Sequence, residues 1–416
     1  MNYVDSWSRR FSGKAASGVL VVLAAAVGWF WFSRTAEVNA AGGPAESDGS
    51  YRVLAPIESG NLLLFPVVHA NGKAASGTPF LTLDEGLKSG SVEVTEAGKV
   101  RGLVRNRDNG PAIFPDRFRG DQVNTLVLVN NSGKPLLLLA GEIVTGGKQD
   151  RVISKDRIVP PGSDPIDLSV FCIEPGRWVE SSAVFGTSAK APLASFMVQP
   201  TVREQAMVAK DQQSVWNSVH GSITAVASAP APSGGVMVAA APPATTSYAK
   251  AMQSDEFKAK VDDAAAPLMK SRDEIMAQLR KEGAVGVVVA VRGEIVWADL
   301  FSSTDLLSRY WTKLVRSYAA ESLASGETHA APTVADAQRF LEMPSGGTEN
   351  SEGSVGIYRY RELKSNGTET FVLESLLPDA SGDVHISKLK LRSVERRIHP
   401  MGGVLLVPPP IRPPVE

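Results

Sequence analysis

A charged, glycine-rich turn that follows directly on an apolar strand is the feature that most constrains this fold. Residues 136–140 are all apolar and run into residues 141–151, which read GEIVTGGKQDR. Residues 171–178, FCIEPGRW, form a second turn of the same kind. A strand that is apolar on both faces is typical of the interior of a sheet. We therefore expect these two turns to lie at the centre of the fold.

The first half of the chain has strand composition. Residues 62–68 and 92–95 are predicted strands, and residues 81–87 between them fit a short helix. Two further strands, 123–130 and 136–140, flank a turn-rich spacer that is typical of a hairpin. In a strand over 166–174, alternation places Cys172 on the same face as Val170. This alternation predicts that Cys172 points into the core.

After residue 200 the hydrophobic period becomes helical. Thr201 and Glu204 fit a capping box, and residues 248–281 are helical in pattern with a break expected near Pro267. Residues 287–291 and 295–300 are predicted to form a β-hairpin, followed by a helix that begins at an S-x-x-D cap. The apolar stripe of that helix consists of Leu307, Tyr310, Trp311, Leu314 and Tyr318.

Together these patterns predict an α+β protein with a β-rich core that is closed by two or three helices and a hairpin. We expect one domain over residues 51–323 with a mobile Ala/Pro-rich insertion at 225–247. A linker at 324–353, a small C-terminal β unit at 354–398 and a proline-rich tail at 399–416 follow. The tail is expected to be extended and available to a protein partner.

The N-terminus carries an uncharged stretch of 18 residues, 15–32, preceded by Arg9, Arg10 and Lys14. As a helix it would span roughly 27 Å, close to the ~30 Å hydrocarbon core of a bilayer. Residues 1–34 therefore predict a cytoplasmic tip and a transmembrane anchor, with 35–50 as a tether and the body outside the cytoplasm. A cleaved signal peptide is the alternative, because residues 38–40 offer a small-residue cleavage site. Both interpretations export the body.

Composition and motifs exclude several classes of function. The 43 basic and 44 acidic residues give a net charge of -1, which gives no support to nucleic-acid binding. The single cysteine excludes an intrachain disulfide, and the five histidines lack the spacing of a zinc site. The first turn fails the phosphate-binding P-loop pattern, because Gly147 stands where that pattern needs lysine. We expect no metal and no cofactor.

The two turns still provide a candidate ligand site. Glu142 and Glu174 are the candidate acid/base residues, since partial burial raises a carboxyl pKa. The candidate ligand-binding residues are Gly146, Gly147, Lys148, Gln149, Arg151, Arg177 and Trp178. The glycines would donate backbone amides to an anion, the cations would neutralise it, and the indole would stack. The alternative is an ion-pair network in which the same charges clamp the two turns together.

Three separated blocks resemble a known family. The blocks GEIVTGGKQDRVI, FCIEPGRW and AVRGEIVWADLFSSTDLLSRYWTKLVRSYAAE are similar to a bacterial family of uncharacterised domains. That family is named for its association with ADP-ribosylglycohydrolases and the rhodanese-phosphatase superfamily. The resemblance implies a role near ADP-ribose or NAD-derived metabolites, without an established active site. The N-terminal stretch and the Ala/Pro insertion depart from a compact family domain.

Two functions follow from these observations. The first is a membrane-tethered ligand-binding domain that binds or acts on a nucleotide-like anionic metabolite, with enzymatic activity left open. The second is a non-enzymatic envelope scaffold or protein-interaction module. The second function predicts that the charges of the turns are paired with each other and that no cavity lies between the turns.

Overall fold

The computed structural model describes eleven parts of the chain, and the fold below refers to them. They are residues 50–71, 79–97, 124–176, 182, 185–186, 197–230, 245–270, 272–324, 326–342, 347–365 and 367–391. The predicted anchor and its tether, most of the insertion, Arg177, Trp178 and the proline-rich tail lie outside them. Within the described parts, no helix is both long and apolar enough to cross a membrane.

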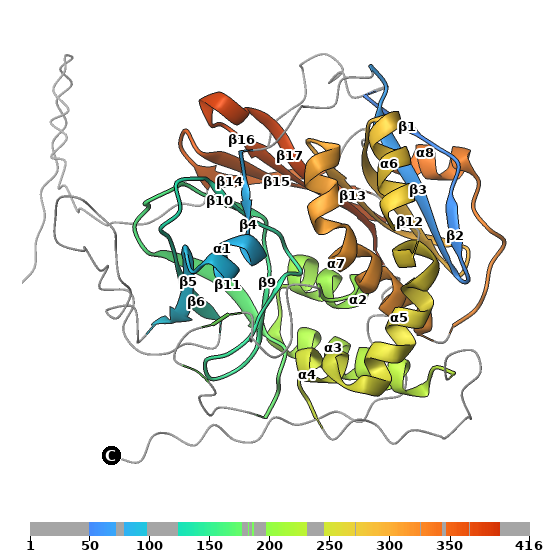
Figure 1. Cartoon of the computed structure of the whole chain (residues 1–416), viewed down its shortest axis with the longest axis horizontal. Coiled ribbons are helices and arrows are strands. Elements are labelled where there is room, and N and C mark those ends of the chain that lie inside the picture. Colours follow the sequence, from blue (N-terminus) through green and yellow to red (C-terminus); the bar gives the residue numbers. More distant parts are fainter. Residues whose placement is uncertain are drawn as a thin grey trace, which may run out of the picture. The chain divides into compact units, whose positions relative to one another are not determined.

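A nine-stranded antiparallel sheet joins the two ends of the described chain (Figure 1). Its order is β1-β3-β12-β13-β17-β16-β15-β14, and β2 pairs with β3. The strands are β1 (Tyr51–Val53), β2 (Ile57–Ser59), β3 (Leu62–His69), β12 (Ala284–Val291), β13 (Glu294–Phe301), β14 (Thr348–Ser354), β15 (Tyr358–Ser365), β16 (Thr368–Ser375) and β17 (Gly382–Lys390). Strands from the first and the last parts of the described chain thus form one sheet.

Two smaller sheets form the second β-rich part. A five-stranded sheet has the order β5-β6-β11-β9-β8, and a three-stranded sheet has the order β10-β7-β4. Their strands are β4 (Leu81–Thr82), β5 (Val92–Glu96), β6 (Thr125–Asn130), β7 (Leu136–Leu138), β8 (Ile143–Val144), β9 (Arg151–Ile153), β10 (Arg157–Val159) and β11 (Ile166–Cys172). Their shared core includes Leu126, Leu138 and Val170, and Leu83 of α1 (Leu83–Ser89) packs into it.

Helices cover both faces of the large sheet. The described α-helices after α1 are α2 (Pro200–Glu204), α3 (Gln212–Ser228), α4 (Tyr248–Gln253), α5 (Asp255–Lys270), α6 (Arg272–Glu282), α7 (Thr304–Leu323) and α8 (Val334–Leu341). A π-helix, Gln205–Ala209, follows α2, and a 3-10 turn, Pro378–Ala380, precedes β17. Helix α7 packs on β12 and β13, with α5 against α7, whereas α8 contacts β1 and β13. Because both faces are covered, every residue of β12 is buried.

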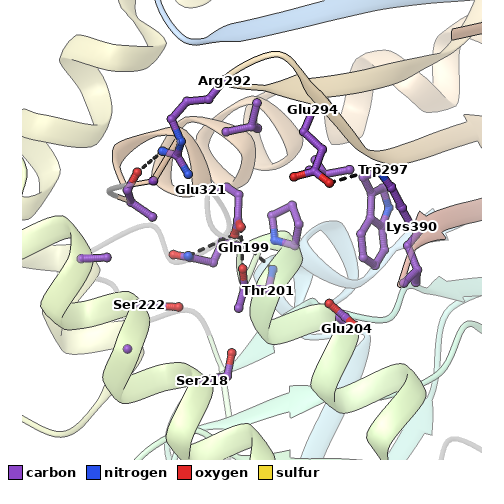
Figure 2. Close-up of a pocket in the computed structure, with 18 of the residues that line it drawn as sticks. Gln199, Thr201, Glu204, Ser218, Ser222, Arg292, Glu294, Trp297, Glu321 and Lys390 are labelled. Atoms are coloured by element: carbon purple, nitrogen blue, oxygen red, sulfur yellow. Dashed lines mark hydrogen bonds and ion pairs between the residues drawn. The ribbon is translucent and has the colours of Figure 1, made fainter. Parts of the chain in front are cut away.

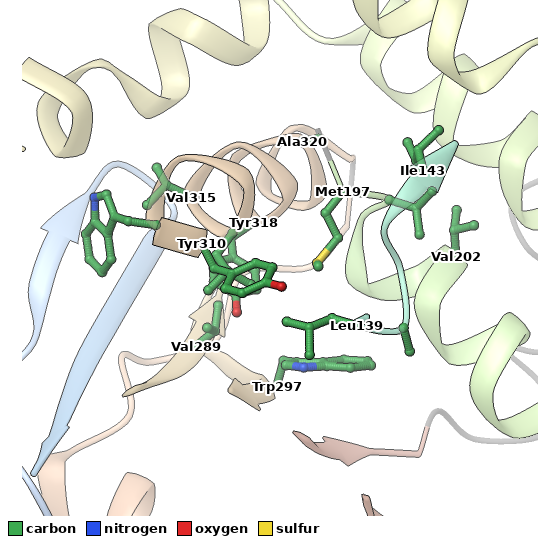
Figure 3. Close-up of a cluster of buried hydrophobic side chains, with 14 of the residues drawn as sticks. Leu139, Ile143, Met197, Val202, Val289, Trp297, Tyr310, Val315, Tyr318 and Ala320 are labelled. Carbon is green, nitrogen blue, oxygen red and sulfur yellow. The ribbon is translucent and has the colours of Figure 1, made fainter. Parts of the chain in front are cut away.

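Helix α7 organises the largest core. Ser303 is its N-cap and accepts a hydrogen bond from the Leu306 amide, which fixes the start of the helix. Figure 3 shows Tyr310 and Tyr318 of α7 facing Val289 and Trp297 of the large sheet. Burying an aromatic or branched side chain of this kind stabilises the fold by about 1.5–3 kcal/mol each. The core therefore holds α7 against the sheet.

The predicted α+β class, the β12–β13 hairpin, the short helix α1 and the burial of Cys172 are confirmed. The described residues contain more helices than the two or three expected. The predicted C-terminal β unit extends the large sheet through the pairing of β17 with β13, and the expected linker region contains α8 and most of β14. These strand pairings join residues that are far apart in the sequence, so a local sequence pattern does not predict them.

Two local predictions about helix ends were wrong. Thr201 does not cap a helix, because Gln199 is the N-cap of α2 and the Thr201 hydroxyl hydrogen-bonds Glu321 instead. Helix α5 continues past Pro267, and the next helix begins only at Arg272. In both cases tertiary packing overrides the local signal.

Candidate functional site

The backbone amides of the first turn donate to oxygens of the protein itself. The amides of Gly146 and Lys148 donate to the carboxylates of Asp150 (3.2 Å) and Glu96 (2.8 Å). The amide of Gly147 donates to a serine hydroxyl at 3.2 Å. Gly147 has a φ of 50°, and a Cβ there would lie 2.3 Å from a phenylalanine ring. The donors expected to bind an anion are thus already engaged, and their role in ligand binding stays a prediction.

Glu142 lies in a buried ion-pair cluster with two other elements. Its Oε1 accepts from Lys313 Nζ of α7 at 2.7 Å, and Lys313 also contacts Asp84 of α1 at 2.5 Å. Its Oε2 accepts from the Leu139 amide at 2.8 Å. Burial raises the pKa of Glu142 and of Asp84, although the shared ammonium opposes the rise. The three charges connect the first turn to both helices.

Glu174 joins the two turns to each other. Its Oε1 accepts from Lys250 Nζ at 2.9 Å, and its Oε2 accepts from the Asp150 amide at 3.2 Å. The Gln149 side chain donates to the backbone oxygen of Glu174 at 3.1 Å. Arg151 is fully buried in β9, beside Cys172 in the sheet. The structure therefore brings Gln149, Arg151 and Glu174 together, whereas Glu142 pairs with α7.

A pocket of about 450 Å³ lies elsewhere, between α3, the β12–β13 hairpin and the end of α7 (Figure 2). None of the described residues of the two turns lines it. Its walls come from residues 199–205, 214–225, 291–297, 321–329 and 389–391. Segments that are distant in the sequence thus converge on one cavity.

Four buried polar atoms in the walls of this pocket have no hydrogen-bond partner in the protein. They are Gln199 Oε1, Ser218 Oγ, Ser222 Oγ and Trp297 Nε1. The four residues are only 1–4% exposed. Figure 2 shows both serine hydroxyls on one side of α3, where the i, i+4 spacing places them. Leaving such a group without a partner costs about 1–3 kcal/mol, so their presence together calls for an explanation.

Neighbouring contacts hold Gln199 in place. Its Nε2 donates to Glu321 Oε2 at 3.1 Å, and the same carboxylate accepts from the Thr201 amide at 3.1 Å. The Gln199 amide group is thereby oriented, with its Oε1 left over. This orientation fixes one acceptor in the pocket before any ligand arrives.

The charges that line the pocket do not favour an anion. Among the described residues that line the pocket, the carboxylates are Glu204, Glu294, Glu321 and Glu327. The cations are Arg292 and Lys390. Lys390 pairs with Glu294 at 3.0 Å, and the Arg292 guanidinium donates to backbone carbonyls at the end of α7. The four atoms named above belong to neutral side chains, as suits a neutral hydroxylated molecule.

A buried charge network lies behind the pocket wall. The Arg203 guanidinium makes a bidentate contact with Asp299 at 2.9 and 3.0 Å and stacks over Trp297, 4.4 Å from the ring centroid. His385 lies between Asp156 at 2.6 Å and Asp299 at 3.2 Å. Burial alone would raise the pKa of Asp299, but Arg203 and His385 hold it well below its usual range. The network fixes the indole of Trp297, which lines the pocket.

We expect His385 to make stability depend on pH. Burial would lower the pKa of His385, but Asp156 and Asp299 outweigh it and raise the pKa to about 9 from 6.5. The stability contributed by a raised pKa is fully present at pH values below the pKa of the unfolded state. It is lost as pH rises through the folded-state pKa of about 9. The free energy of unfolding, measured with urea, should therefore fall by about 1.5 kcal/mol between pH 6.5 and 8.

The matched variant for this pH dependence is His385→Gln, which should lose the slope between pH 6.5 and 8. Lys388 acts in the opposite direction at higher pH, because burial lowers its pKa to about 8. Below pH 8 the pH dependence of stability therefore reports mainly on His385 and not on Lys388. An unchanged slope in His385→Gln would show that His385 is not the titrating group.

The pocket residues were missed at the level of sequence. Ser218 and Ser222 fall on the same face of α3 as the buried Val215 and Val219. Two hydroxyls inside an apolar helical stripe are the signal that was available. Gln199 and Trp297 carry no such signal, because neither type nor spacing distinguishes them.

Comparisons with known proteins give a family and no closer relative. No curated protein and no solved structure matches the chain. A family model for the ARG and Rhodanese-Phosphatase-superfamily-associated Protein domain matches residues 50–389, which takes in strands of all three sheets and most of the pocket lining. The chain belongs to the family of ARG and Rhodanese-Phosphatase-superfamily-associated Protein domains.

Proposed function

We propose that this chain is a membrane-tethered small-molecule-binding domain, and that its ligand is a hydroxyl-bearing molecule held between α3 and the β12–β13 hairpin. The observation that carries the proposal is the set of four unpartnered buried polar atoms in one pocket. A buried polar group without a partner is costly, and sites that bind ligands accept such a cost. In this proposal the uncharged stretch 15–32 is the membrane anchor, and residues 35–50 are the tether.

The chemistry of the four atoms suits a sugar-like ligand. Trp297 Nε1 is a donor, Gln199 Oε1 is an acceptor, and each serine hydroxyl is both. A ligand hydroxyl also donates and accepts, so several hydroxyls on one ring can satisfy this set. Among the nucleotide-like metabolites that the family resemblance suggests, the pocket fits the ribose part better than the phosphates, because its two cations already have partners.

The pairing of charges at the two turns favours the second candidate, a protein-interaction module, for that part of the molecule. Glu142 pairs with Lys313, and Glu174 pairs with Lys250. The charges are thus satisfied within the protein, although by lysines of α7 and α4 and not by each other. In that role the proline-rich tail and the body would bind a protein partner, and the pocket would stay empty of small molecules.

A thermal-shift screen separates the two candidates. The probes are D-ribose, D-glucose, D-galactose, ADP-ribose, NAD and inorganic phosphate, added to the body of the chain from residue 50 and to the full chain in detergent. A ligand at 100 times its Kd stabilises by about 2.7 kcal/mol, which for a domain of this length corresponds to a rise in Tm of roughly 3–5 °C. We expect a rise with a saccharide or with ADP-ribose and none with phosphate.

The turn variant Arg177→Ala serves as the control for the location of the site. Stabilisation that survives in Arg177→Ala and is lost in Gln199→Leu supports the pocket. Stabilisation that is lost only in Arg177→Ala would move the site to the turns. No shift with any probe would favour the interaction module.

A further inference from the structure

A second cavity, of about 320 Å³, adjoins the pocket. Both cavities are lined by Ala225 of α3, by Arg292 of the hairpin turn, and by Ala324 and Gly326 after α7. Since the same four residues line both, the two cavities are neighbours. We call them the first and the second compartment.

The second compartment differs from the first in chemistry. Its walls include Ala229, Pro230 and Leu323, and its polar residues are neutral apart from Arg292. None of the four carboxylates of the first compartment lines it. A polar, hydrogen-bonding compartment thus adjoins a less polar one.

Arg292, which lines both cavities, is held in place by hydrogen bonds of its backbone and its side chain. Its φ of 50° is in the left-handed region, where a non-glycine residue is strained. Its amide donates to the Asn61 carbonyl at 2.7 Å, and its guanidinium donates to the Ser322 carbonyl at 3.1 Å. Next to it, a Cβ on Gly293 would lie 2.4 Å from the His329 carbonyl, so this turn is packed closely. Figure 2 shows Arg292 reaching the end of α7 at the edge of the pocket.

We infer that the ligand has two parts and belongs to the glycosides, with a sugar in the first compartment and an apolar aglycone in the second. This inference rests on the proposed function of the pocket. The sugar hydroxyls satisfy the donors and acceptors of Gln199, Ser218, Ser222 and Trp297. The aglycone extends past the side of Arg292 into the second compartment and contacts Ala229 and Leu323 there.

Calorimetric titration with paired glycosides tests the inference. The probes are the methyl and phenyl β-glycosides of D-ribose, D-glucose and D-galactose. For the sugar that binds, the phenyl glycoside should have a Kd roughly tenfold lower than the methyl glycoside, because a phenyl ring leaves water for an apolar wall. Equal affinities would overturn the two-part ligand while leaving the pocket proposal intact.

Two tryptophan variants on α3 locate the effect. Ser228→Trp fills the second compartment and should remove the advantage of the phenyl glycoside without changing the affinity of the methyl glycoside. Thr224→Trp is the control, because Thr224 is exposed on the same helix and lines neither cavity. A phenyl advantage that persists in Ser228→Trp would overturn the assignment of the second compartment. Absence of binding by every glycoside would overturn the glycoside inference, whereas the proposed function itself is rejected only if ADP-ribose, NAD and the free sugars also give no thermal shift.

Discussion

Replacing Asp299 with asparagine is expected to lower the free energy of unfolding by about 3–5 kcal/mol, because it leaves buried positive charge without its partner. Asp299 is fully buried and contacts Arg203, His385, Ser387 and the Tyr318 hydroxyl. Because asparagine has nearly the same size as aspartate, the lower free energy of unfolding would result from the lost charge and not from a change in volume. Urea unfolding at pH 7 measures the loss of stability, and Tm should fall by roughly 4–7 °C.

The control for this variant is Asp305→Asn, whose carboxylate pairs with Arg309 at a solvent-accessible position. An exposed pair of this kind contributes about 0–1 kcal/mol. The double variant Arg203→Met with Asp299→Leu should recover part of the stability, since apolar residues replace a buried pair at little cost. A loss in Asp299→Asn no larger than that in Asp305→Asn would contradict the role given to the network.

The second large effect is expected for Lys313→Met, which removes the one ammonium shared by Glu142 and Asp84. Two neighbouring carboxylates would then lie in a buried site without a cation, at a cost of about 3–5 kcal/mol. Because burial already raises the pKa of both groups, acid should relieve the defect by protonating them. The loss of stability should therefore be smaller at pH 5 than at pH 8.

Lys155→Met is the matched control, since Lys155 pairs with Glu352 at the surface. We expect a change below about 1 kcal/mol there, with no dependence on pH in this range. If Lys313→Met were as mild as Lys155→Met, Glu142 would be free to serve as the acid or base that its sequence context suggested.

Local features of the fold followed from the sequence because their causes are local. The β12–β13 hairpin has its turn at Arg292 and Gly293, and α7 carries an apolar stripe that begins at Leu307. Alternation in β11 placed Cys172 inside. In each case the residue pattern within about 20 positions decides the outcome.

Long-range pairing did not follow from the sequence. The pairing of β3 with β12 and of β13 with β17 joins segments whose patterns are compatible with many partners. The same limit hid the pocket, whose walls come from distant segments and whose key residues are an ordinary glutamine, two serines and a tryptophan. The charged turns drew attention because their residues are chemically conspicuous, yet Glu142 and Glu174 pair with lysines.

The most direct test of the pocket is the ligand-free stability and the binding of the double variant Ser218→Ala, Ser222→Ala. If these hydroxyls are kept for a ligand, their removal should raise the free energy of unfolding by about 1 kcal/mol, since alanine leaves no unsatisfied group and favours the helix. The same variant should lose the stabilisation by saccharide or ADP-ribose, while Thr224→Ala keeps it. A double variant that is less stable than the wild type and still responds to the ligand would contradict the account.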